Sequence, residues 1–215
     1  MVKAVLFDLD GTLIDTERIY QIVWPQTIEH FGYKMTRQQA LQLRSLGRPF
    51  APEKFREWYG DDFDYHEARE YRKKLFEDII KKEGISLKPG AKEILSYLKD
   101  RGILISTATA TDEERTERYL KKVGLFEYFD KICCATMVKE GKPKPDIYLY
   151  AADKVGVPKE NCLAVEDAPN GVRSASSAGI KTIYIPDQND DEDEIKGLYY
   201  KKIGSLLELK NIIEN

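Results

Sequence analysis

Two aspartates stand two positions apart near the amino terminus. Asp8 and Asp10 directly follow the apolar run of residues 2–6, which has the length of a short buried strand. In a strand, residues i and i+2 project to the same side, so both carboxylates would be presented together at the edge of a sheet. Gly11 then lets the chain bend sharply away. An isolated Asp-x-Asp-Gly is also typical of an acidic hairpin turn, so the remaining sequence has to distinguish the two interpretations.

Three later predicted strands are also followed by polar residues. Ligands of a parallel sheet covered by helices bind beyond the carboxyl ends of the strands. The residues at those ends are Thr109 after residues 103–108, Lys142 after residues 131–135, and Glu166 with Asp167 after residues 162–165. With the first pair, they supply a carboxylate nucleophile, a second carboxyl for proton transfer, a hydroxyl and an ammonium for phosphate oxygens, and acidic ligands for a hard cation. This set favours phosphoryl transfer.

Phosphoryl transfer to a carboxylate requires nearby positive charge because the phosphate is dianionic. A lysine and a divalent cation would offset the repulsion. Magnesium prefers oxygen ligands in octahedral geometry, which suits Asp8, Asp167 and a backbone carbonyl, with Glu166 as a further candidate. Asp10 would give a proton to the leaving oxygen and then activate the water that hydrolyses the acyl phosphate.

Each residue also has a structural explanation when it is taken alone. Thr109 could belong to a Thr-rich strand end, and Lys142 could begin a turn before a proline. The pair Glu166-Asp167 could favour the positive N-terminal end of the following helix. Their order along the chain, each at a predicted strand end, favours the catalytic interpretation.

Strand and helix patterns alternate from residue 85 onwards. Predicted helices cover residues 91–99, 113–122, 146–155, 169–178 and 205–213, and predicted strands cover residues 103–108, 131–135, 162–165, 181–185 and 199–203. Such alternation predicts an α/β fold, a doubly wound parallel sheet with helices on both faces. Residues 16–84 instead carry only helical patterns, rich in aromatic and basic residues, and predict an inserted all-α segment.

The chain of 215 residues is 42% hydrophobic and 33% charged, which is ordinary for a soluble globular protein. A net charge of −3 gives no electrostatic reason for binding nucleic acid or a membrane surface. We find no apolar stretch of the ~20 residues that span a bilayer and no signal-type amino terminus. We therefore expect a cytoplasmic protein with a small-molecule partner, either a monomer or a weak homodimer.

Two further groups of residues have no expected metal-binding role. Cys133, Cys134 and Cys162 are interpreted as reduced core thiols, and neither they nor the two histidines have zinc-site spacing. The acidic run of residues 187–194 lacks the glycine and the final glutamate of an EF-hand loop. We expect this run to be a solvated surface loop.

Four motifs in order resemble the haloacid dehalogenase superfamily, in the branch that includes beta-phosphoglucomutase, phosphoglycolate phosphatase and small sugar-phosphate phosphatases. They are FDLDGTLIDT at residues 7–16, ISTAT at 105–109, GKPKPD at 141–146 and VEDAPNGV at 165–172. Together they span nearly the whole chain. The resemblance implies a Rossmann-like catalytic core of residues 1–15 and 85–215, with a helical cap domain of the first type at residues 16–84.

The resemblance also implies roles for individual residues in an aspartyl-phosphate mechanism. Asp8 would be the nucleophile and Asp10 the acid and base. Contacts with the substrate phosphate would come from Thr109, Ala110 and Lys142. Mg²⁺ would bind Asp8, the Asp10 carbonyl and Asp167, with Glu166 as a direct or water-mediated ligand. Members that cleave carbon–halogen bonds or phosphonates replace the residue at the position of Asp10, so this aspartate favours phosphate esters.

The cap would select the substrate and exclude water on closing. Gly47 and Arg48 resemble its substrate-specificity loop, and Arg48 could pair with a second phosphate or a carboxylate. Phosphomutase members commonly place a histidine where Tyr20 stands, which favours hydrolysis. We therefore predict a phosphatase acting on a small phosphorylated metabolite, with a phosphomutase as the alternative. A phosphoaspartate signalling receiver is a distant third, because its acidic pair and its phosphorylated aspartate lie on different strands.

Overall fold

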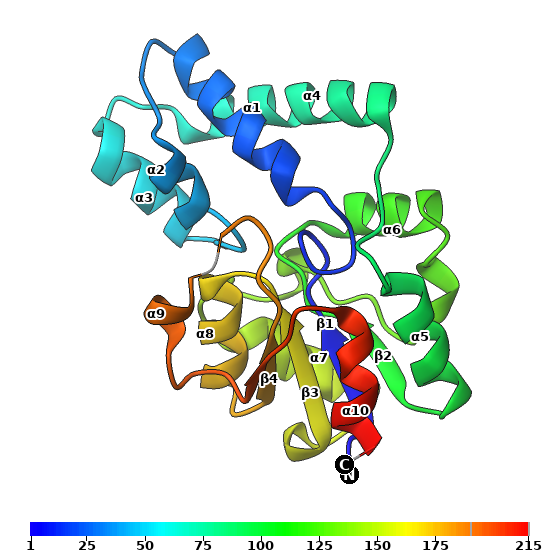
Figure 1. Cartoon of the computed structure of the whole chain (residues 1–215). Helices are drawn as coiled ribbons and strands as arrows, with labels where there is room; N and C mark the ends of the chain where they lie inside the picture. The colour runs from blue at the N-terminus through cyan, green and yellow to red at the C-terminus, as the bar shows by residue number, and fades with distance from the viewer. Residues whose placement is uncertain (190, 215) are drawn as a thin grey trace.

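A five-stranded parallel sheet forms the centre of the computed structural model, which describes residues 1–189 and 191–214 (Figure 1). Across the described residues, the strand order is β2-β1-β3-β4-β5 and every pair is parallel. The strands are β1 (Ala4–Phe7), β2 (Leu104–Thr107), β3 (Cys162–Glu166), β4 (Lys181–Tyr184) and β5 (Lys201–Lys202). The first strand is therefore central, and its four residues are fully buried.

Helices cover both faces of the sheet, as the α/β, doubly wound prediction requires. They are α5 (Ala91–Asp100), α6 (Glu113–Lys122), α7 (Asp146–Val155), α8 (Pro169–Ser177), α9 (Glu192–Ile195) and α10 (Leu209–Glu214). Val5 and Phe7 pack with α5, α6 and α10 in one hydrophobic core. Ala4 and Leu6 pack with α7 and α8 in a second core. Because strand side chains alternate between faces, one buried strand serves both cores.

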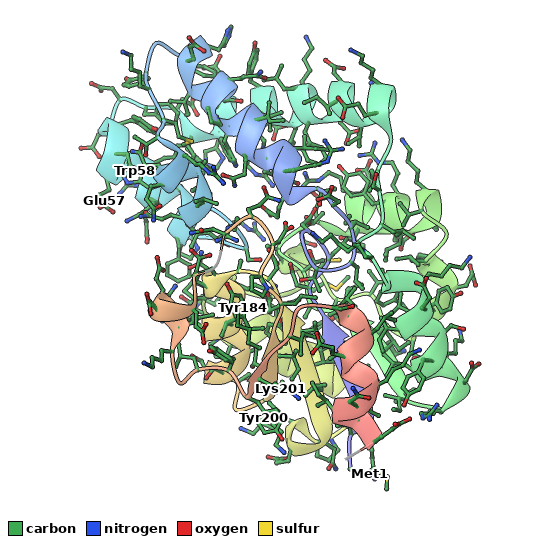
Figure 2. The ribbon with its side chains drawn as sticks, viewed as in Figure 1. Met1, Glu57, Trp58, Tyr184, Tyr200 and Lys201 are labelled. Atoms are coloured by element: carbon green, nitrogen blue, oxygen red, sulfur yellow. The ribbon has the colours of Figure 1, made fainter. Side chains whose placement is uncertain are left out.

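The inserted segment is entirely helical, and it lies above the sheet in Figure 1, coloured blue to cyan. Its helices are α1 (Glu17–His30), α2 (Arg37–Gln42), α3 (Phe50–Tyr59) and α4 (Tyr65–Glu83). The helices α1, α3 and α4 share an aromatic core built around Trp24 and Phe55, against which Trp58 and Tyr59 pack. Figure 2 shows Trp58 in this layer, away from the sheet. The all-α insertion is thus confirmed.

The predicted strand at residues 131–135 is wrong. Only single bridges occur there, Ser106 to Lys131 and Thr109 to Cys134. The Thr107 hydroxyl donates to the Cys133 carbonyl at 2.9 Å and accepts from its N–H at 2.8 Å. Backbone hydrogen bonds still join β2 to this segment, from the Lys131 N–H to the Ile105 carbonyl and from the Thr107 and Thr109 N–H groups to the Lys131 and Cys133 carbonyls. The segment therefore pairs with β2 without forming a continuous strand. The last predicted strand is also shorter than expected, and the last helix begins with a 3₁₀ turn at Leu206–Glu208.

The acidic run of residues 187–194 is not simply a solvated loop. Asp191 is buried and forms an ion pair with Arg44 of the helical insertion, and Asp187 pairs with Lys88. Asp190, within this run, lies outside the described residues. The three cysteines are buried and unbridged, as predicted. No helix in residues 1–189 and 191–214 is long and apolar enough to cross a membrane.

Candidate active site

The register of the sheet brings the ends of β1, β2 and β3 to one edge. Residues Ala4–Phe7 pair in step with both neighbouring strands. Beyond the strand, the Asp8 N–H donates to the Val165 carbonyl at 3.0 Å, and the Ala108 N–H donates to the Phe7 carbonyl at 2.8 Å. Asp8 therefore lies between the polar residues that follow β2 and those that end β3, where parallel sheets bind ligands.

Lys142 connects two of the predicted site residues. Its Nζ donates to Asp8 Oδ1 at 2.6 Å and to Glu166 Oε1, and all three side chains are enclosed. The Tyr148 hydroxyl donates to the same Glu166 oxygen at 2.5 Å. Burial lowers the pKa of Lys142, but the attraction of Asp8 and Glu166 outweighs it, so the pKa is raised overall. Lys142 is therefore a fixed, permanently charged ammonium beside the predicted nucleophile.

Asp10 is held by two hydroxyl groups. Thr16 Oγ1 donates to one carboxylate oxygen at 2.5 Å, and Thr111 Oγ1 donates to the other at 2.7 Å. Asp10 is 7% exposed and lines a cavity between the sheet edge and the helical insertion. Its carboxylate is not part of the cluster formed by Asp8, Glu166 and Asp167. The two threonines give this carboxyl one orientation, separate from that of Asp8.

Asp8, Glu166 and Asp167 form a cluster of buried carboxylates whose ligand oxygens lie within 4.8 Å of one another. Each retains one enclosed oxygen without a hydrogen-bond partner among the described residues: Asp8 Oδ2, Glu166 Oε2 and Asp167 Oδ2. Gly11 leaves the space beside this cluster open, because a Cβ there would lie 2.4 Å from Asp167 Oδ2. Three converging carboxylate oxygens fit a hard divalent cation, and Mg²⁺ is such an ion.

The acidic cluster is electrostatically unfavourable on its own. Burial raises the pKa of Asp8 to about 8, with Lys142 lowering it and Glu166 and Asp10 raising it further. Burial, followed by the charges of Asp8, Glu17 and Glu166, raises the pKa of Asp167 well above its ordinary value. One lysine does not neutralise the cluster, so a cation would be needed to keep these carboxylates ionised together.

The predicted phosphate-binding residues divide between a cavity wall and the enclosed interior. Asp8, Asp10, Thr109 and Ala110 line a cavity of about 490 Å³ between the sheet edge and the helical insertion. Lys142 does not line it and contacts Asp8 from within the protein. The Thr109 Oγ1 accepts the Thr111 N–H at 3.1 Å. The proton of the Thr109 hydroxyl thus remains available to a phosphate oxygen.

The loop of Gly47 and Arg48 lines the same cavity and contacts the loop of Gly141 and Lys142. The Gly47 N–H donates to the Lys142 carbonyl at 2.8 Å, and the Gly141 N–H donates to the Arg48 carbonyl at 2.7 Å. A Cβ on Gly47 would lie 2.6 Å from Gly141 Cα, so this approach requires glycine. The Arg48 side chain is exposed, and its charge has no ion-pair partner in the described part of the chain.

Other side chains of the site were not predicted from sequence. Thr16, Thr111 and Tyr148 orient the carboxylates, and Thr12 Oγ1 donates to Asp167 Oδ1 at 3.3 Å. Thr12 and Thr16 lie inside the first motif, residues 7–16, and this position could have indicated that they belong to the site. Glu17 also lines the cavity, and burial together with the Asp10 charge raises its pKa well above the ordinary value.

A second set of contacts joins the helical insertion to the core on another side. Arg44 and Asp191 form a buried ion pair. The Asn170 Nδ2 donates to the Gln42 carbonyl at 3.1 Å and to the Arg44 carbonyl at 2.9 Å. Together with the Gly47 loop, these contacts join the insertion to the rest of the chain beside the sheet edge.

Comparisons with known proteins agree with this arrangement. A family model described as haloacid dehalogenase-like hydrolase matches residues 2–179. The phosphorylated carbohydrates phosphatase of Thermotoga maritima is 31% identical over 189 residues, which cover 85% of this chain and 84% of that protein. The beta-phosphoglucomutase of Bacillus subtilis is 30% identical over 190 residues, with 86% and 83% coverage.

A solved structure extends the similarity to three dimensions. The crystal structure of CbbY from Rhodobacter sphaeroides in complex with xylulose-1,5-bisphosphate superposes with a TM-score of 0.82 at 29% identity. The match covers 97% of this chain and 96% of that one. Both the sheet and the helical insertion therefore have counterparts in a solved relative.

Proposed function

The chain belongs to the haloacid dehalogenase-like hydrolases, and from this premise we propose that it is a magnesium-dependent phosphatase of a small phosphorylated metabolite, acting through an aspartyl-phosphate. It is an enzyme of the sugar-phosphate phosphatase and phosphomutase type. The observation that carries the finer proposal is Asp8, which contacts a buried lysine and stands in an acidic cluster beside Asp10. We assign residues 1–15 and 85–215 to the catalytic core and residues 16–84 to the cap.

Asp8, Glu166 and Asp167 would hold the magnesium ion, with the Asp10 carbonyl as a further ligand. When bound, the ion would offset the charge of the carboxylates and of the incoming phosphate. Lys142 contributes a fixed positive charge at Asp8, and the Thr109 hydroxyl is free to donate to a phosphate oxygen. Together these groups would reduce the repulsion between the phosphate dianion and the Asp8 carboxylate.

In the first step, a carboxylate oxygen of Asp8 attacks phosphorus and the bond from phosphorus to the ester oxygen breaks. Asp10 gives its proton to the departing alkoxide, so the products are an alcohol and an acyl phosphate on Asp8. The two hydroxyl donors, Thr16 and Thr111, keep the Asp10 carboxyl directed away from the acidic cluster. Separate fixation of the two aspartates matches their separate roles.

In the second step, water attacks the phosphorus of the acyl phosphate. Asp10, now a carboxylate, takes a proton from that water, and the bond from phosphorus to the Asp8 oxygen breaks. Inorganic phosphate leaves, Asp8 returns to a carboxylate and Asp10 returns to its acid form. A cap that closes over the cavity would limit how much water reaches the acyl phosphate, the group that water or another acceptor attacks.

A phosphomutase is the second candidate, because beta-phosphoglucomutase is among the relatives. Tyr20 stands where such enzymes commonly carry a histidine, and it lines the cavity with its ring stacked 4.5 Å from that of Phe76. Incubation with a sugar monophosphate and its bisphosphate separates the two reactions. Free phosphate supports the phosphatase, whereas an isomerised sugar phosphate without net hydrolysis would favour the mutase.

Replacement of the nucleophile tests the mechanism directly. We expect Asp8→Asn to lower phosphate release from a panel of phosphomonoesters by at least about 10³-fold, since an amide cannot form the acyl phosphate. Circular dichroism should show that the variant is folded. Asp100→Asn, an exposed change on α5, is the control and should retain activity. Sustained turnover by Asp8→Asn would overturn the proposed mechanism.

A further inference from the structure

Arg72 of α4 is a buried cation in the wall of the active-site cavity. Its residue is 5% exposed, and its Nε is enclosed without a hydrogen-bond partner among the described residues. Burying a guanidinium is unfavourable unless other groups compensate its charge. The protein therefore maintains a positive charge at this point of the cavity that forms no ion pair with the described residues.

Two aromatic rings of α1 contact the Arg72 guanidinium. Its Cζ lies 5.1 Å from the ring centre of Tyr20 and 5.1 Å from that of Trp24. Such cation–π contacts offset part of the burial cost and fix the plane of the group. They leave the N–H donors, which lie in that plane, unused. Those donors are the groups that bind carboxylate or phosphate oxygens in a bidentate manner.

Four other cations on the cavity wall differ from Arg72 because they already have acidic partners, whereas Arg48 is unpaired among the described residues but exposed. Arg69 and Lys73, also on α4, both contact Glu70. Arg115 contacts Asp112, and Arg44 contacts Asp191. These acids are engaged by other cations, so they do not neutralise Arg72, and its own donors stay free. This part of the cavity wall is thus suited to an anion, and the same cavity reaches the predicted phosphoryl-transfer site at Asp8.

We infer that Arg72 binds a second anionic group of the substrate, so the enzyme prefers a phosphorylated sugar that carries a further phosphate or carboxylate. This inference rests on the proposed phosphatase function and specifies its substrate class. One phosphate would lie at Asp8 and react, and the second anion would lie at Arg72 and orient the molecule. Binding energy at the unreactive end would then be used to position the reacting end.

The substrate pairs that test this inference differ only in the second anion. Ribulose 1,5-bisphosphate is compared with ribulose 5-phosphate, and 6-phosphogluconate with sorbitol 6-phosphate, its open-chain counterpart without the carboxylate. The measured quantity is the ratio of kcat/KM within each pair, from phosphate release. The wild-type enzyme should prefer the doubly anionic member of at least one pair by about 10-fold or more, the effect of hydrogen bonds to a charged group. The pair that shows the preference identifies a phosphate or a carboxylate as the second anion.

Arg72→Gln should lower that ratio by about 10- to 100-fold, chiefly through the doubly anionic substrate. Lys74→Gln removes the same charge from an exposed position of α4 and should leave the ratio unchanged. Arg72→Lys keeps the charge but loses the planar donor pair, so its ratio should be intermediate. If Arg72→Gln does not fold, Arg72→Lys alone decides: a lowered ratio supports the inference, and an unchanged ratio overturns it.

Two other results would overturn the inference while leaving the phosphatase in place. One is a wild-type enzyme that hydrolyses monophosphates without preference in either pair. The other is an equal loss for both members of a pair in Arg72→Gln, as a purely structural role would give. Absence of phosphate release from every substrate, by contrast, would contradict the proposed function itself.

Discussion

Lys142 illustrates at the residue scale why this site needs a cation that the chain does not supply. Its ammonium contacts two carboxylates, and a third, Asp167, belongs to the same cluster. Buried ions cost several kcal/mol each unless they are paired with good geometry. One positive charge cannot compensate three negative ones. The unpartnered carboxylate oxygens are consistent with this imbalance, and burial, with a smaller contribution from Glu166, raises the pKa of Asp8.

The Tyr148 hydroxyl should control metal affinity through Glu166, to which it donates at 2.5 Å. Partners that orient metal ligands in this way typically change affinity by about 10- to 100-fold when they are removed. We therefore expect Tyr148→Phe to raise by that factor the magnesium concentration that gives half-maximal phosphate release. Tyr150→Phe, on the same helix, is the matched control. A fall in kcat with unchanged magnesium dependence would show that Tyr148 does not act through a metal ligand.

The sequence could place Asp8, Thr109 and Glu166-Asp167 because each lies at the end of a predicted strand and parallel strands end at one edge. Lys142 also reaches this site, although the strand predicted before it at residues 131–135 does not form. The catalytic roles of these residues remain predictions. The hydroxyls that orient them could not be predicted in the same way. Thr111 contacts Asp10 across 101 positions of the chain. A threonine or tyrosine is common everywhere, so nothing local distinguishes these residues from ordinary surface or core positions.

At the element scale, the contact between the Gly47 loop and the Gly141 loop leaves no room for a side chain. We expect Gly47→Ala to lower kcat/KM by about 10- to 100-fold, because the new Cβ would lie 2.6 Å from Gly141 Cα and displace the loop that closes the cavity. Steady-state kinetics checks this expectation. Gly204→Ala, where the nearest atom would be 3.6 Å away, is the control. Wild-type kinetics in Gly47→Ala would show that this close approach is unimportant for turnover.

Elements with strong end signals were predicted to the residue, whereas weakly marked ones were not. The helices α6 and α7 begin and end where expected. The side chain of Asp112 accepts the Arg115 N–H at the start of α6, and Gly156 ends α7 with a positive φ of 68°. The strand expected at residues 131–135 has no comparable signal. The Thr107 side chain, which bonds to both backbone groups of Cys133, interrupts its pairing with β2, and no periodicity could reveal this.

At the scale of the whole molecule, the acidic cluster should make stability depend on pH and on magnesium. Asp8 has an ordinary pKa of 3.8 and a folded value of about 8, and Asp167 is also raised. The folded state therefore binds more protons than the unfolded state between these values. The stability contributed by protonation is fully present below about pH 4 and is lost as the pH rises through about 8. We expect the Tm of the metal-free protein to fall from pH 6 to pH 8.

Added magnesium should reverse this loss, because it binds the ionised carboxylates of the folded state. At about 100 times its Kd, a ligand stabilises by about 2.7 kcal/mol, which is roughly 5–10 °C for a chain of this size. Differential scanning calorimetry should therefore show a larger magnesium shift at pH 8 than at pH 6. Asp167→Asn should reduce both the pH dependence and the shift. A shift that is independent of pH would contradict a role for these carboxylates.

The contacts between the helical insertion and the sheet-bearing part are the feature that the sequence reveals least. Arg44 and Asp191 are 147 positions apart, and a charged residue within an acidic run is ordinarily solvated. Only the fold shows that the two bury each other. The general architecture was accessible from alternating patterns and ordered motifs, but the contacts that seat the cap depend on surfaces formed after folding.

Lys142 links these scales, since its carbonyl accepts the Gly47 N–H while its ammonium contacts Asp8. Movement of the Gly47 loop away from the sheet edge would displace Lys142, the residue that contacts the predicted nucleophile. Release of the product and loss of the Lys142 contact with Asp8 would thus accompany the same loop movement. The Asp8 carboxylate would then lose its contact with the Lys142 ammonium when the cavity opens, and it would be held for reaction only while the cavity is covered.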